Sequence, residues 1–431
     1  MANNNSKILV TSNSLINSFR ETMSKDKDYE MRNEAEFDVQ YPTGFLNIDF
    51  MNGQRINVED LENGRFFQYD SVGIVDGSIN CFIGRSGCGK STIIKQMAAN
   101  IIRPFPNGMI IEDSIEGGIT SRREEILTKF TPSQINERMV RRNAGVTAES
   151  FYKRIRAIYD LKTSDPDMYR YDTGLFDSRG NRIFKFQPTV YILDSLAMLM
   201  PKKVTEEEEL SGQMSATAAA KTIAAIFRRI VPLIKAANVI VMIVNHITEK
   251  VEINAFTHTK SQNIYLKQNE TCPGGVTPFY TYNNVFRLDD GDAKFVTDTL
   301  NLNGGSVVDV SLVKSRTNKA GRTVPMVFDQ DNGFDPEFSM LLTLKKAGVI
   351  NGSGAFLYLG DHSDKKFSQK NFKKLIYTDP EFRNIYYQES LKYLKTMLAD
   401  HQEINDEYSG IDPASDMINM LRESEGINNH S

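Results

Sequence analysis

Apolar stretches of two kinds alternate through the middle of the chain. Short continuous apolar runs are typical of strands buried on both faces of a parallel sheet, whereas apolar residues that recur every three or four positions are typical of helices. The short runs occupy residues 79–83, 108–113, 189–195 and 239–244, and the helical spacing occurs at residues 93–101 and 216–237. This alternation predicts an α/β core with a mostly parallel, twisted sheet and helices on both faces.

The outer parts of the chain have weaker patterns. Further strands are expected over residues 281–288, 297–303 and 307–313. From Met397 onward there are eight Asp or Glu residues against one Arg, which predicts an acidic, disordered tail. We therefore divide the chain into an N-terminal segment with an oligomerisation helix and a linker (1–40), a core (41–340), a small C-terminal α/β or helical domain (341–396) and the tail (397–431).

Two insertions interrupt the core pattern, at residues 54–76 and 120–186. The first is polar, and the second is long for a single crossover. Turn-forming residues at 177–181 predict a hairpin within the second insertion. Its basic residues, among them Arg154 and Arg156, are expected on a solvent-exposed helix face.

Composition limits the function classes. Hydrophobic residues make up 40% of the chain and charged residues 25%, as in ordinary soluble globular proteins. A net charge of −4 excludes a uniformly basic nucleic-acid coat, so any DNA contact must come from local patches. The three cysteines provide neither a disulfide framework nor a C-x-x-C metal pattern. Because the sequence has no signal-peptide pattern and no run of about eighteen apolar residues, we expect no membrane association and a cytoplasmic location.

One glycine-rich stretch carries the strongest chemical signal. It fits G-x-x-x-x-G-K-[ST] between a predicted strand and a predicted helix, which is the context of a phosphate-binding loop. Lys90 would reach the β- and γ-phosphates of a nucleotide, and the Ser91 hydroxyl would bind Mg²⁺. The alternative is an ordinary glycine-rich turn, but the flanking elements favour phosphate binding. The candidate nucleotide-binding residues are Gly84, Arg85, Ser86, Gly87, Cys88, Gly89, Lys90, Ser91 and Thr92.

Acidic residues follow two of the predicted strands. Asp194 ends one apolar run, a pattern typical of a strand that delivers a carboxylate to the Mg²⁺ of a nucleotide-hydrolysing enzyme. Glu112, Asp113 and Glu116 lie at the end of another. Ligands of open parallel sheets bind at the carboxyl ends of the strands, so these carboxylates are expected beside the glycine-rich stretch.

The order of these motifs resembles that of the RecA-like recombinases, and in particular the recombinases of phages. The resemblance covers roughly residues 41–350 and depends, besides the glycine-rich stretch, on six motifs in the same order. They are Thr43-Gly44 to Gly53, Asp194-Ser195-Leu196-Ala197, Val244-Asn245-His246, Gly274 to Tyr280, Lys314-Ser315-Arg316-Thr317 and Gly333-Phe334-Asp335-Pro336. It implies a RecA-like P-loop ATPase core.

The resemblance also implies roles for catalytic residues. Glu116 matches the glutamate that activates the attacking water, although the spacing is one residue longer than usual, so Asp113 and Glu112 remain rivals. His246 matches the residue that senses the γ-phosphate, or else it is an ordinary polar residue at a strand end. Lys314 and Arg316 match two cations that reach a neighbouring subunit's ATP. A solvent-facing Lys-x-Arg pair is the alternative.

Two polar, aperiodic stretches match the DNA-binding loops of that family, since spaced lysines and aromatic residues can follow a phosphate backbone and stack on bases. An acidic run at residues 206–209 fits poorly beside DNA and makes the first loop the weaker assignment. The candidates are Lys202, Lys203 and Met214 in the first stretch, and Phe256, Lys260, Tyr265, Lys267, Gly274 and Gly275 in the second.

The sequence therefore predicts a DNA-dependent ATPase with ATP and Mg²⁺ as cofactors. The resemblance implies a recombinase that forms a helical filament on single-stranded DNA and pairs it with homologous double-stranded DNA. It implies a single-strand-binding protein and a loader as further partners, in a bacterial cytoplasm if the chain is phage-encoded. A hexameric DNA helicase and a non-catalytic ATP-binding mediator are the alternatives. The residues that recognise adenine and the role of residues 120–186 stay open.

Overall fold

The computed structural model describes most of the chain between residues 38 and 398. The described ranges are 38–60, 64–117, 119–177, 180–206, 212–249, 265–267, 269–274, 277–292, 305–353 and 356–398, with the single residues 22, 417 and 420, and without the side chains of 59, 60, 206 and 212–218. The predicted N-terminal helix, the strand at 297–303 and nearly all of the acidic tail lie outside these residues.

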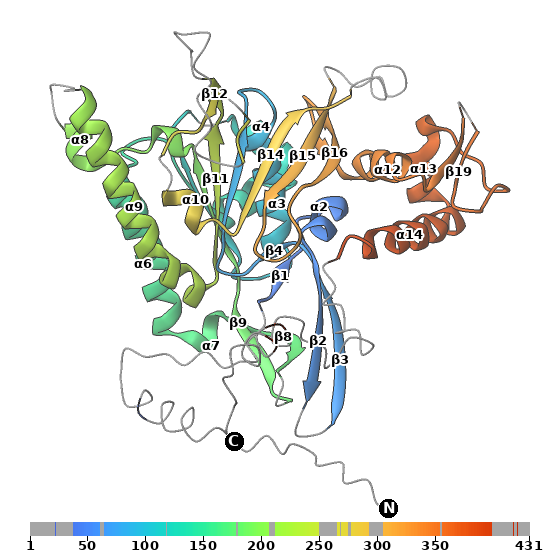
Figure 1. The fold of residues 1–431 in the computed structure, drawn as a ribbon, viewed down its shortest axis with the longest axis horizontal. Coiled ribbons are helices and arrows are strands. Elements are labelled where there is room, and N and C mark those ends of the chain that lie inside the picture. Colours follow the sequence, from blue (N-terminus) through green and yellow to red (C-terminus); the bar gives the residue numbers. More distant parts are fainter. Residues whose placement is uncertain are drawn as a thin grey trace, which may run out of the picture.

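A nine-stranded mixed sheet forms the centre of the molecule (Figure 1). Six neighbouring strands are parallel, and the last three run antiparallel to one another. In order across the sheet they are β17 (Gly333–Asp335), β16 (Arg322–Asp329), β15 (Ser306–Lys314), β14 (Asn284–Asp290), β5 (Ile79–Gly84), β11 (Val239–His246), β10 (Thr189–Asp194), β6 (Met109–Ser114) and β7 (Met139–Arg142). The predicted α/β class with a mostly parallel sheet is confirmed.

Helices cover both faces of the sheet. Alternate residues of each buried strand point to opposite sides, so each strand contributes side chains to both faces. Phe82 of β5 belongs to one core cluster, while Cys81 and Ile83 belong to the other. The first cluster includes residues of α2 (Leu46–Met51), α3 (Lys90–Ile102), α12 (Pro336–Lys346), α13 (Gln369–Thr378) and α14 (Pro380–Lys395). The second includes residues of α6 (Ala148–Ser164), α9 (Gly212–Ala237) and α10 (Thr277–Thr281). The strands therefore read as continuous apolar runs because both of their faces are buried.

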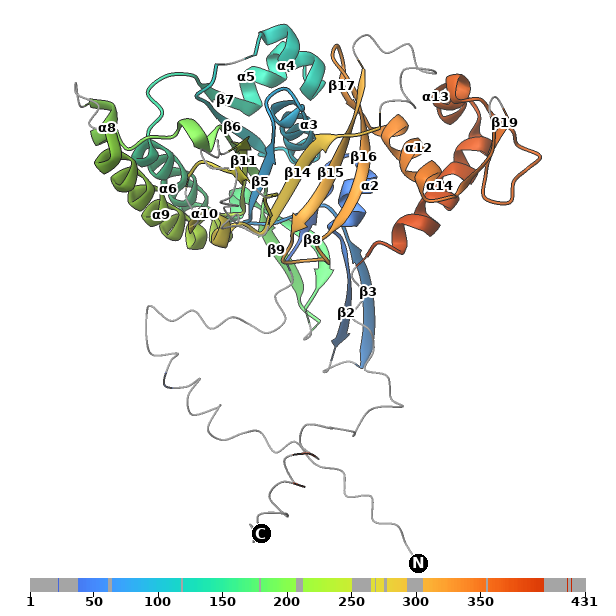
Figure 2. The same cartoon turned by 45° about the horizontal axis from the view of Figure 1, so that its top comes forward.

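Both insertions contain β-hairpins that project away from the sheet (Figure 2). The first insertion forms β2 (Gln54–Asp60) and β3 (Arg65–Ser71), and the hairpin predicted in the second consists of β8 (Arg170–Phe176) and β9 (Arg182–Phe186). The second insertion also holds α4 (Ser121–Thr128), α5 (Pro132–Arg138), α6, α7 (Pro166–Tyr169) and the edge strand β7. Strand β7 therefore extends the sheet, while α5 contributes Ile135 to the first core cluster and α6 contributes Phe151 to the second, on the opposite face.

Short elements complete the fold. Strand β1 (Gln40–Tyr41) pairs with β4 (Ile74–Val75), β12 (Thr248–Glu249) with β13 (Glu270–Thr271), and β18 (Ile350–Ser353) with β19 (Phe356–Leu359). The 3₁₀ helix η1 (Leu196–Met198) and helix α8 (Lys202–Glu206) follow β10. The C-terminal part combines helices with one strand pair, and α12 runs across the predicted boundary at residue 340.

Two local expectations are wrong. The strand predicted from residue 281 begins at Asn284, because residues 277–281 form α10, where Phe279 packs into the core. Arg154 is not on a solvent-exposed face, since its side chain is 16% exposed and forms an ion pair with Asp113. Arg156 does lie on the exposed side of α6, paired with Asp160. Among the described helices, none has both the length and the apolar composition needed to cross a bilayer.

Candidate functional site

The glycine-rich loop (residues 84–91) joins the central strand β5 to α3. Gly87 and Gly89 have φ angles of 82° and 85°, a conformation that residues with a Cβ rarely adopt. A Cβ on Gly89 would also come within 2.8 Å of the Phe334 ring. The loop needs glycine at these positions, and it leaves the first N–H groups of a thirteen-residue helix facing the end of the strand.

Lys90, the first residue of α3, is buried and folds back over the glycine-rich loop. Its Nζ donates hydrogen bonds to the carbonyl oxygens of Gly84, at 3.0 Å, and Arg85, at 2.6 Å. An ammonium group has three protons to donate, and both of these acceptors are neutral. Among the described residues, Lys90 therefore has no carboxylate in ion-pair contact, and its Nζ lies against the loop backbone.

Ser91 and Asp194 form a candidate cation site beside Lys90. Asp194 ends β10 and is only 7% exposed. Burial raises the pKa of Asp194, as do the carboxylates of Glu116 and Glu112, while a hydrogen bond from Ser91 opposes this rise. Its Oδ1 has no hydrogen-bond partner among the described residues. A buried carboxylate oxygen without a donor, next to a hydroxyl, fits the oxygen ligands that Mg²⁺ prefers.

Glu116 lies between the ends of three neighbouring strands. Its Oε1 accepts a hydrogen bond from the Ser195 hydroxyl and lies 2.7 Å from His246 Nε2. Glu116 follows β6, Ser195 follows β10, and His246 ends β11, so the sheet order β6-β10-β11 brings them together. Burial would raise the pKa of Glu116, but the hydrogen bonds from Ser195 and His246 outweigh it and hold that pKa below its usual value. Glu116 is therefore an ionised acceptor at neutral pH.

The two rival carboxylates are engaged elsewhere. Glu112 accepts from Lys95 at 2.5 Å in a buried group that also contains Glu124. Asp113 points to the opposite face of the sheet and is bound by Tyr191 and Arg154. Neighbouring strand residues alternate between faces, which separates this pair. Of the three candidates, Glu116 is the one in contact with His246.

Lys314 and Arg316 lie at the other end of the sheet. Lys314 pairs with Val285, which pairs with Cys81 near the start of β5, whereas the glycine-rich loop follows the end of that strand. Each residue of a strand adds about 3.3 Å, so several residues of β5 separate these cations from the loop by roughly 10 Å or more. Within one chain, neither cation reaches Lys90.

Backbone carbonyls of α10 hold both cations. Lys314 Nζ donates to Phe279 O, and Arg316 Nη2 donates to Tyr280 O at 2.6 Å. Arg316 lies beyond the end of β15, so the two side chains share neighbouring acceptors rather than one strand face. Burial, and then the charge of Arg316, lowers the pKa of Lys314 to about 8.

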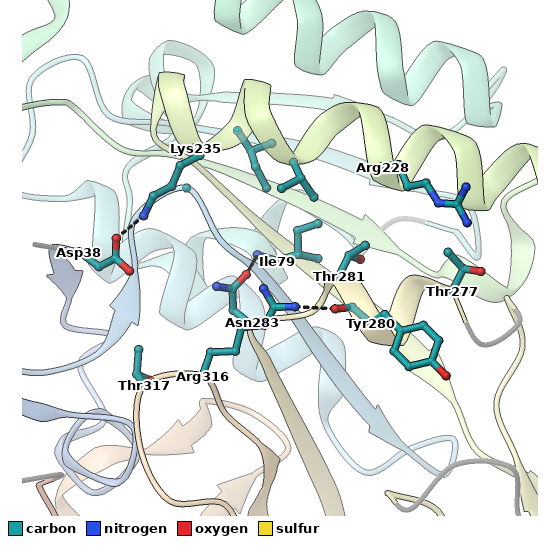
Figure 3. Close-up of a pocket in the computed structure, with 13 residues that line it drawn as sticks. Asp38, Ile79, Arg228, Lys235, Thr277, Tyr280, Thr281, Asn283, Arg316 and Thr317 are labelled. Carbon is teal, nitrogen blue, oxygen red and sulfur yellow. Dashed lines mark hydrogen bonds and ion pairs between the residues drawn. The ribbon is translucent and has the colours of Figure 1, made fainter. Parts of the chain in front are cut away.

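A cavity of about 750 Å³ opens beside Arg316 (Figure 3). Arg228 and Lys235 of α9 and Asn283 also line it, and Lys235 is paired with Asp38. This cavity lies at the amino end of β5. It is therefore separate from the glycine-rich loop of the same chain.

The candidate DNA-binding residues are only partly described. Lys202 and Lys203 are exposed on α8, and Lys267 is exposed within 3.5 Å of Asp289. Tyr265 packs against the core, so a stacking role for it would require that packing to open. The side chain of Met214 and the residues Phe256, Lys260 and Gly275 lie outside the described part of the chain.

The second polar stretch is joined to the strand that carries His246. Asn245 Nδ2 donates to Pro273 O at 2.8 Å, and the Cys272 thiol lies 3.1 Å from His246 O. Gly274 has a φ of 96°, and a Cβ there would come within 2.8 Å of Leu196. A displacement of residues 272–274 would therefore change the contacts at the end of β11 and at the start of η1.

Sequence reasoning assigned no role to Ser195, Asn245 or Cys272. Ser195 and Asn245 adjoin Asp194 and His246 inside recognised motifs, so their position was a usable signal. The sequence contained no such signal for Cys272, because His246, whose carbonyl oxygen it contacts, is 26 residues away. No protein-family model matches the sequence, and no curated protein is significantly similar to it.

Proposed function

We propose that this chain is an ATP-dependent DNA recombinase that assembles as a filament on single-stranded DNA and pairs it with homologous duplex. The observation that carries the proposal is the contact between Glu116 and His246 beside the glycine-rich loop, with the same strand end bonded to the second polar stretch. The end of β11 thereby connects His246, at the proposed nucleotide site, with residues 272–274 of the candidate DNA-binding stretch.

The glycine-rich loop would hold the phosphates of ATP. Its N–H groups, the N-terminus of α3 and the Lys90 ammonium all favour an anion at the end of β5. Ser91 and Asp194 would hold Mg²⁺, which neutralises phosphate charge when bound. Cys88 is buried, and burial raises the pKa of its thiol, so it stays a neutral member of the loop.

Glu116 would act as the general base for hydrolysis. A water molecule attacks the γ-phosphorus, the bond from that phosphorus to the bridging oxygen of ADP breaks, and the proton of the water passes to Glu116. The depressed pKa of Glu116 keeps it ionised before the reaction. His246 would release or hold this carboxylate according to the position of residues 272–274.

Lys314 and Arg316 would complete the site of a second copy. Neutral carbonyls hold both side chains, so their positive charge is available to an anion from outside. A cation that meets the transferring phosphoryl group in this way acts as an arginine finger does. ATP would therefore join neighbouring copies, and hydrolysis would weaken that joint.

The partners that follow are single-stranded and double-stranded DNA, with a single-strand-binding protein and a loader acting on the filament in the cytoplasm. The exposed Lys202, Lys203 and Lys267 would contribute phosphate contacts. Because the chain as a whole is acidic, these local cations must supply the attraction.

The experiment that tests the proposal is ATP-dependent joint-molecule formation. A single strand is incubated with homologous and, separately, heterologous supercoiled duplex. We expect joint molecules only with the homologous duplex, and none with the Lys90→Ala variant. Strand separation on a forked duplex without pairing would instead indicate a helicase, and DNA binding without either activity would indicate a mediator.

A further inference from the structure

An ion pair joins the glycine-rich loop to the start of the second polar stretch. Arg85 Nη2 of the loop lies 2.5 Å from the Oε1 atom of Glu249, which belongs to β12. The chain reaches β12 directly from β11, and the Ile247 N–H donates to Gly84 O at 3.2 Å between these two strands. Among the described residues, Arg85 forms no ion pair with another carboxylate. An arginine of the loop proposed to bind phosphate is therefore already bound to a carboxylate.

Strands β12 and β13 place a second glutamate opposite Glu249. Glu249 pairs with Glu270 in the antiparallel register, so the two side chains lie on one face with about 5 Å between their Cβ atoms. Like charges in this position repel each other. Each strand has only two residues, and isolated strand pairs are marginally stable at best. The pairing of β12 with β13 therefore depends on a cation beside each glutamate.

The cations beside the two glutamates differ in burial. Arg287 of β14 donates to both carboxylate oxygens of Glu270, at 2.6 and 2.8 Å, and the two side chains are 6% and 8% exposed. Arg287 also binds Asp289, so two carboxylates already share its charge. Arg85 and Glu249, by contrast, are 70% and 67% exposed. One glutamate is thus held by a buried pair, and the other by an exposed pair that a competing anion can break.

We propose that a nucleotide phosphate competes with Glu249 for Arg85, and that nucleotide binding thereby weakens the pairing of β12 with β13. A guanidinium group offers a phosphate the same donors that it offers a carboxylate, so the two anions compete for it. When Arg85 turns to the phosphate, Glu249 faces Glu270 without a cation of its own. The effect is reciprocal, because anything that opens this strand pair frees Arg85 and strengthens nucleotide binding.

This inference rests on the proposed function only in that the glycine-rich loop binds the phosphates of a nucleotide. Glu249 is a positioning residue, since it acts through Arg85 and does not touch the nucleotide. The second polar stretch thereby gains a link to the nucleotide site that does not pass through Glu116 or His246.

Equilibrium ATP binding without DNA tests the competition. In the Glu249→Gln variant of the full chain, Arg85 has lost its charged partner. We expect this variant to bind ATP about threefold more tightly than the unmodified chain, a small factor because exposed ion pairs are weak. Arg85→Ala should bind ATP more weakly. Adding Glu249→Gln to Arg85→Ala should change the affinity no further, because the two residues act through one contact.

Asp160→Asn is the matched control, because Asp160 also forms an exposed ion pair with an arginine, Arg156, on α6. It removes one negative charge without touching the loop, so ATP affinity should stay the same. Unchanged affinity of Glu249→Gln would overturn the proposal. So would equally tighter binding when Glu249→Gln is added to Arg85→Ala, since that result would reflect only the loss of a negative charge near an anion site.

The reactivity of Cys272 reports on the strand pair itself. This thiol follows β13 and contacts His246 O, and burial raises its pKa to about 12, so it reacts slowly while the strands are paired. Without nucleotide, Glu249→Gln and Arg85→Ala should each raise its alkylation rate about threefold, as expected for the loss of one exposed ion pair. ATP should raise the rate to the same level in the unmodified chain. Mass spectrometry of the peptides distinguishes Cys272 from the buried Cys81 and Cys88.

The two readouts separate this inference from the proposed function. Equal alkylation rates in the variants and in the unmodified chain would overturn the inference even where ATP binds. An unmodified chain that binds no ATP would overturn the proposed function together with the competition for Arg85.

Discussion

The two ends of the parallel strands hold their charged side chains differently. At the carboxyl end, Glu116 accepts two hydrogen bonds on one oxygen, from Ser195 and His246. At the amino end, Lys314 and Arg316 donate to neutral carbonyls of α10. Among the described residues, neither of these cations is paired with a carboxylate. One end therefore combines the Lys90 ammonium with the carboxylates of Glu116 and Asp194, and the other carries two cations without a carboxylate partner among the described residues.

If the proposed function is correct, this difference means that one chain alone lacks part of the site for hydrolysis. The glycine-rich loop brings the Lys90 charge, but the other two candidate cations lie at the far end of β5. A second copy can supply them only if its amino end faces the first copy's loop, which is a head-to-tail arrangement. The chemistry of the two ends thus predicts the direction of assembly.

Removing the cations of the amino end should have the largest effect on hydrolysis. We expect Lys314→Ala to lower the DNA-dependent ATPase rate by roughly 10³, as losing an arginine finger does. ATP binding, measured by equilibrium filtration, should be nearly unchanged because Lys90 is intact.

Mixing variants tests whether these cations act on another copy. Lys314→Ala and Lys90→Ala subunits are each inactive, but a random head-to-tail mixture leaves roughly one interface in four with an intact loop facing an intact lysine. We expect ATPase activity to return to about that fraction. If every mixture stays inactive, Lys314 either acts on the nucleotide bound by its own chain or takes no part in hydrolysis.

Replacing the candidate base should have the next largest effect. Glu116→Gln keeps the shape of the side chain and removes its basicity, so the hydrolysis rate should fall by about 10², at the low end of what a general base contributes. The matched control is Glu112→Gln, a buried position that is paired with Lys95. Its expected effect is on stability, because the buried Lys95 would lose the nearer of its two carboxylate partners and keep only Glu124.

Thermal unfolding separates these two outcomes. Glu116→Gln should lower the melting temperature slightly, since Glu116 is partly exposed, whereas Glu112→Gln should lower it more. A Glu112→Gln variant that folds normally but fails to hydrolyse ATP would contradict the assignment of the base.

The main strands were predictable, and the reason is their complete burial. Residues 79–83, 190–193 and 239–244 are apolar except for Asn80 because helices cover both faces of these strands. Their ends, and with them Asp194 and His246, could therefore be placed from the sequence. The class of fold followed from the same runs. The function implied by the resemblance stays a prediction.

Contacts between distant residues could not be predicted in this way. The charge pattern of α6 does not reveal that Arg154 faces Asp113 in the sheet, 41 positions away. The β-branched and aromatic residues from Thr281 onward favoured a strand that begins at Thr281, but residues 277–281 form α10, where Phe279 packs into the core. Ser195 meets Glu116 across two neighbouring strand ends, a contact that depends on side-chain orientation.

The smallest expected effect tests that last contact. The Ser195 hydrogen bond lowers the pKa of Glu116, so Ser195→Ala should raise it, and the acid limb of the ATPase pH profile should move to higher pH. The base works only when ionised, so activity is lost earlier as the pH falls, while the rate on the plateau changes by less than about tenfold.

The conservative variant distinguishes this role from a merely structural one. Ser195→Thr keeps the hydroxyl and should return the acid limb to its original position. The depressed pKa of Glu116 also makes stability depend on pH. Ionised Glu116 stabilises the fold at pH values above the pKa that it has in the unfolded chain, and this stabilisation is lost as the pH falls through its lower pKa in the folded chain. Ser195→Ala should therefore reduce the difference in melting temperature between neutral and acidic pH. If the acid limb does not move, the hydrogen bond from His246 alone lowers the pKa of Glu116. The description of the carboxyl end of the sheet would then depend on the end of β11 alone, instead of on the ends of both β10 and β11.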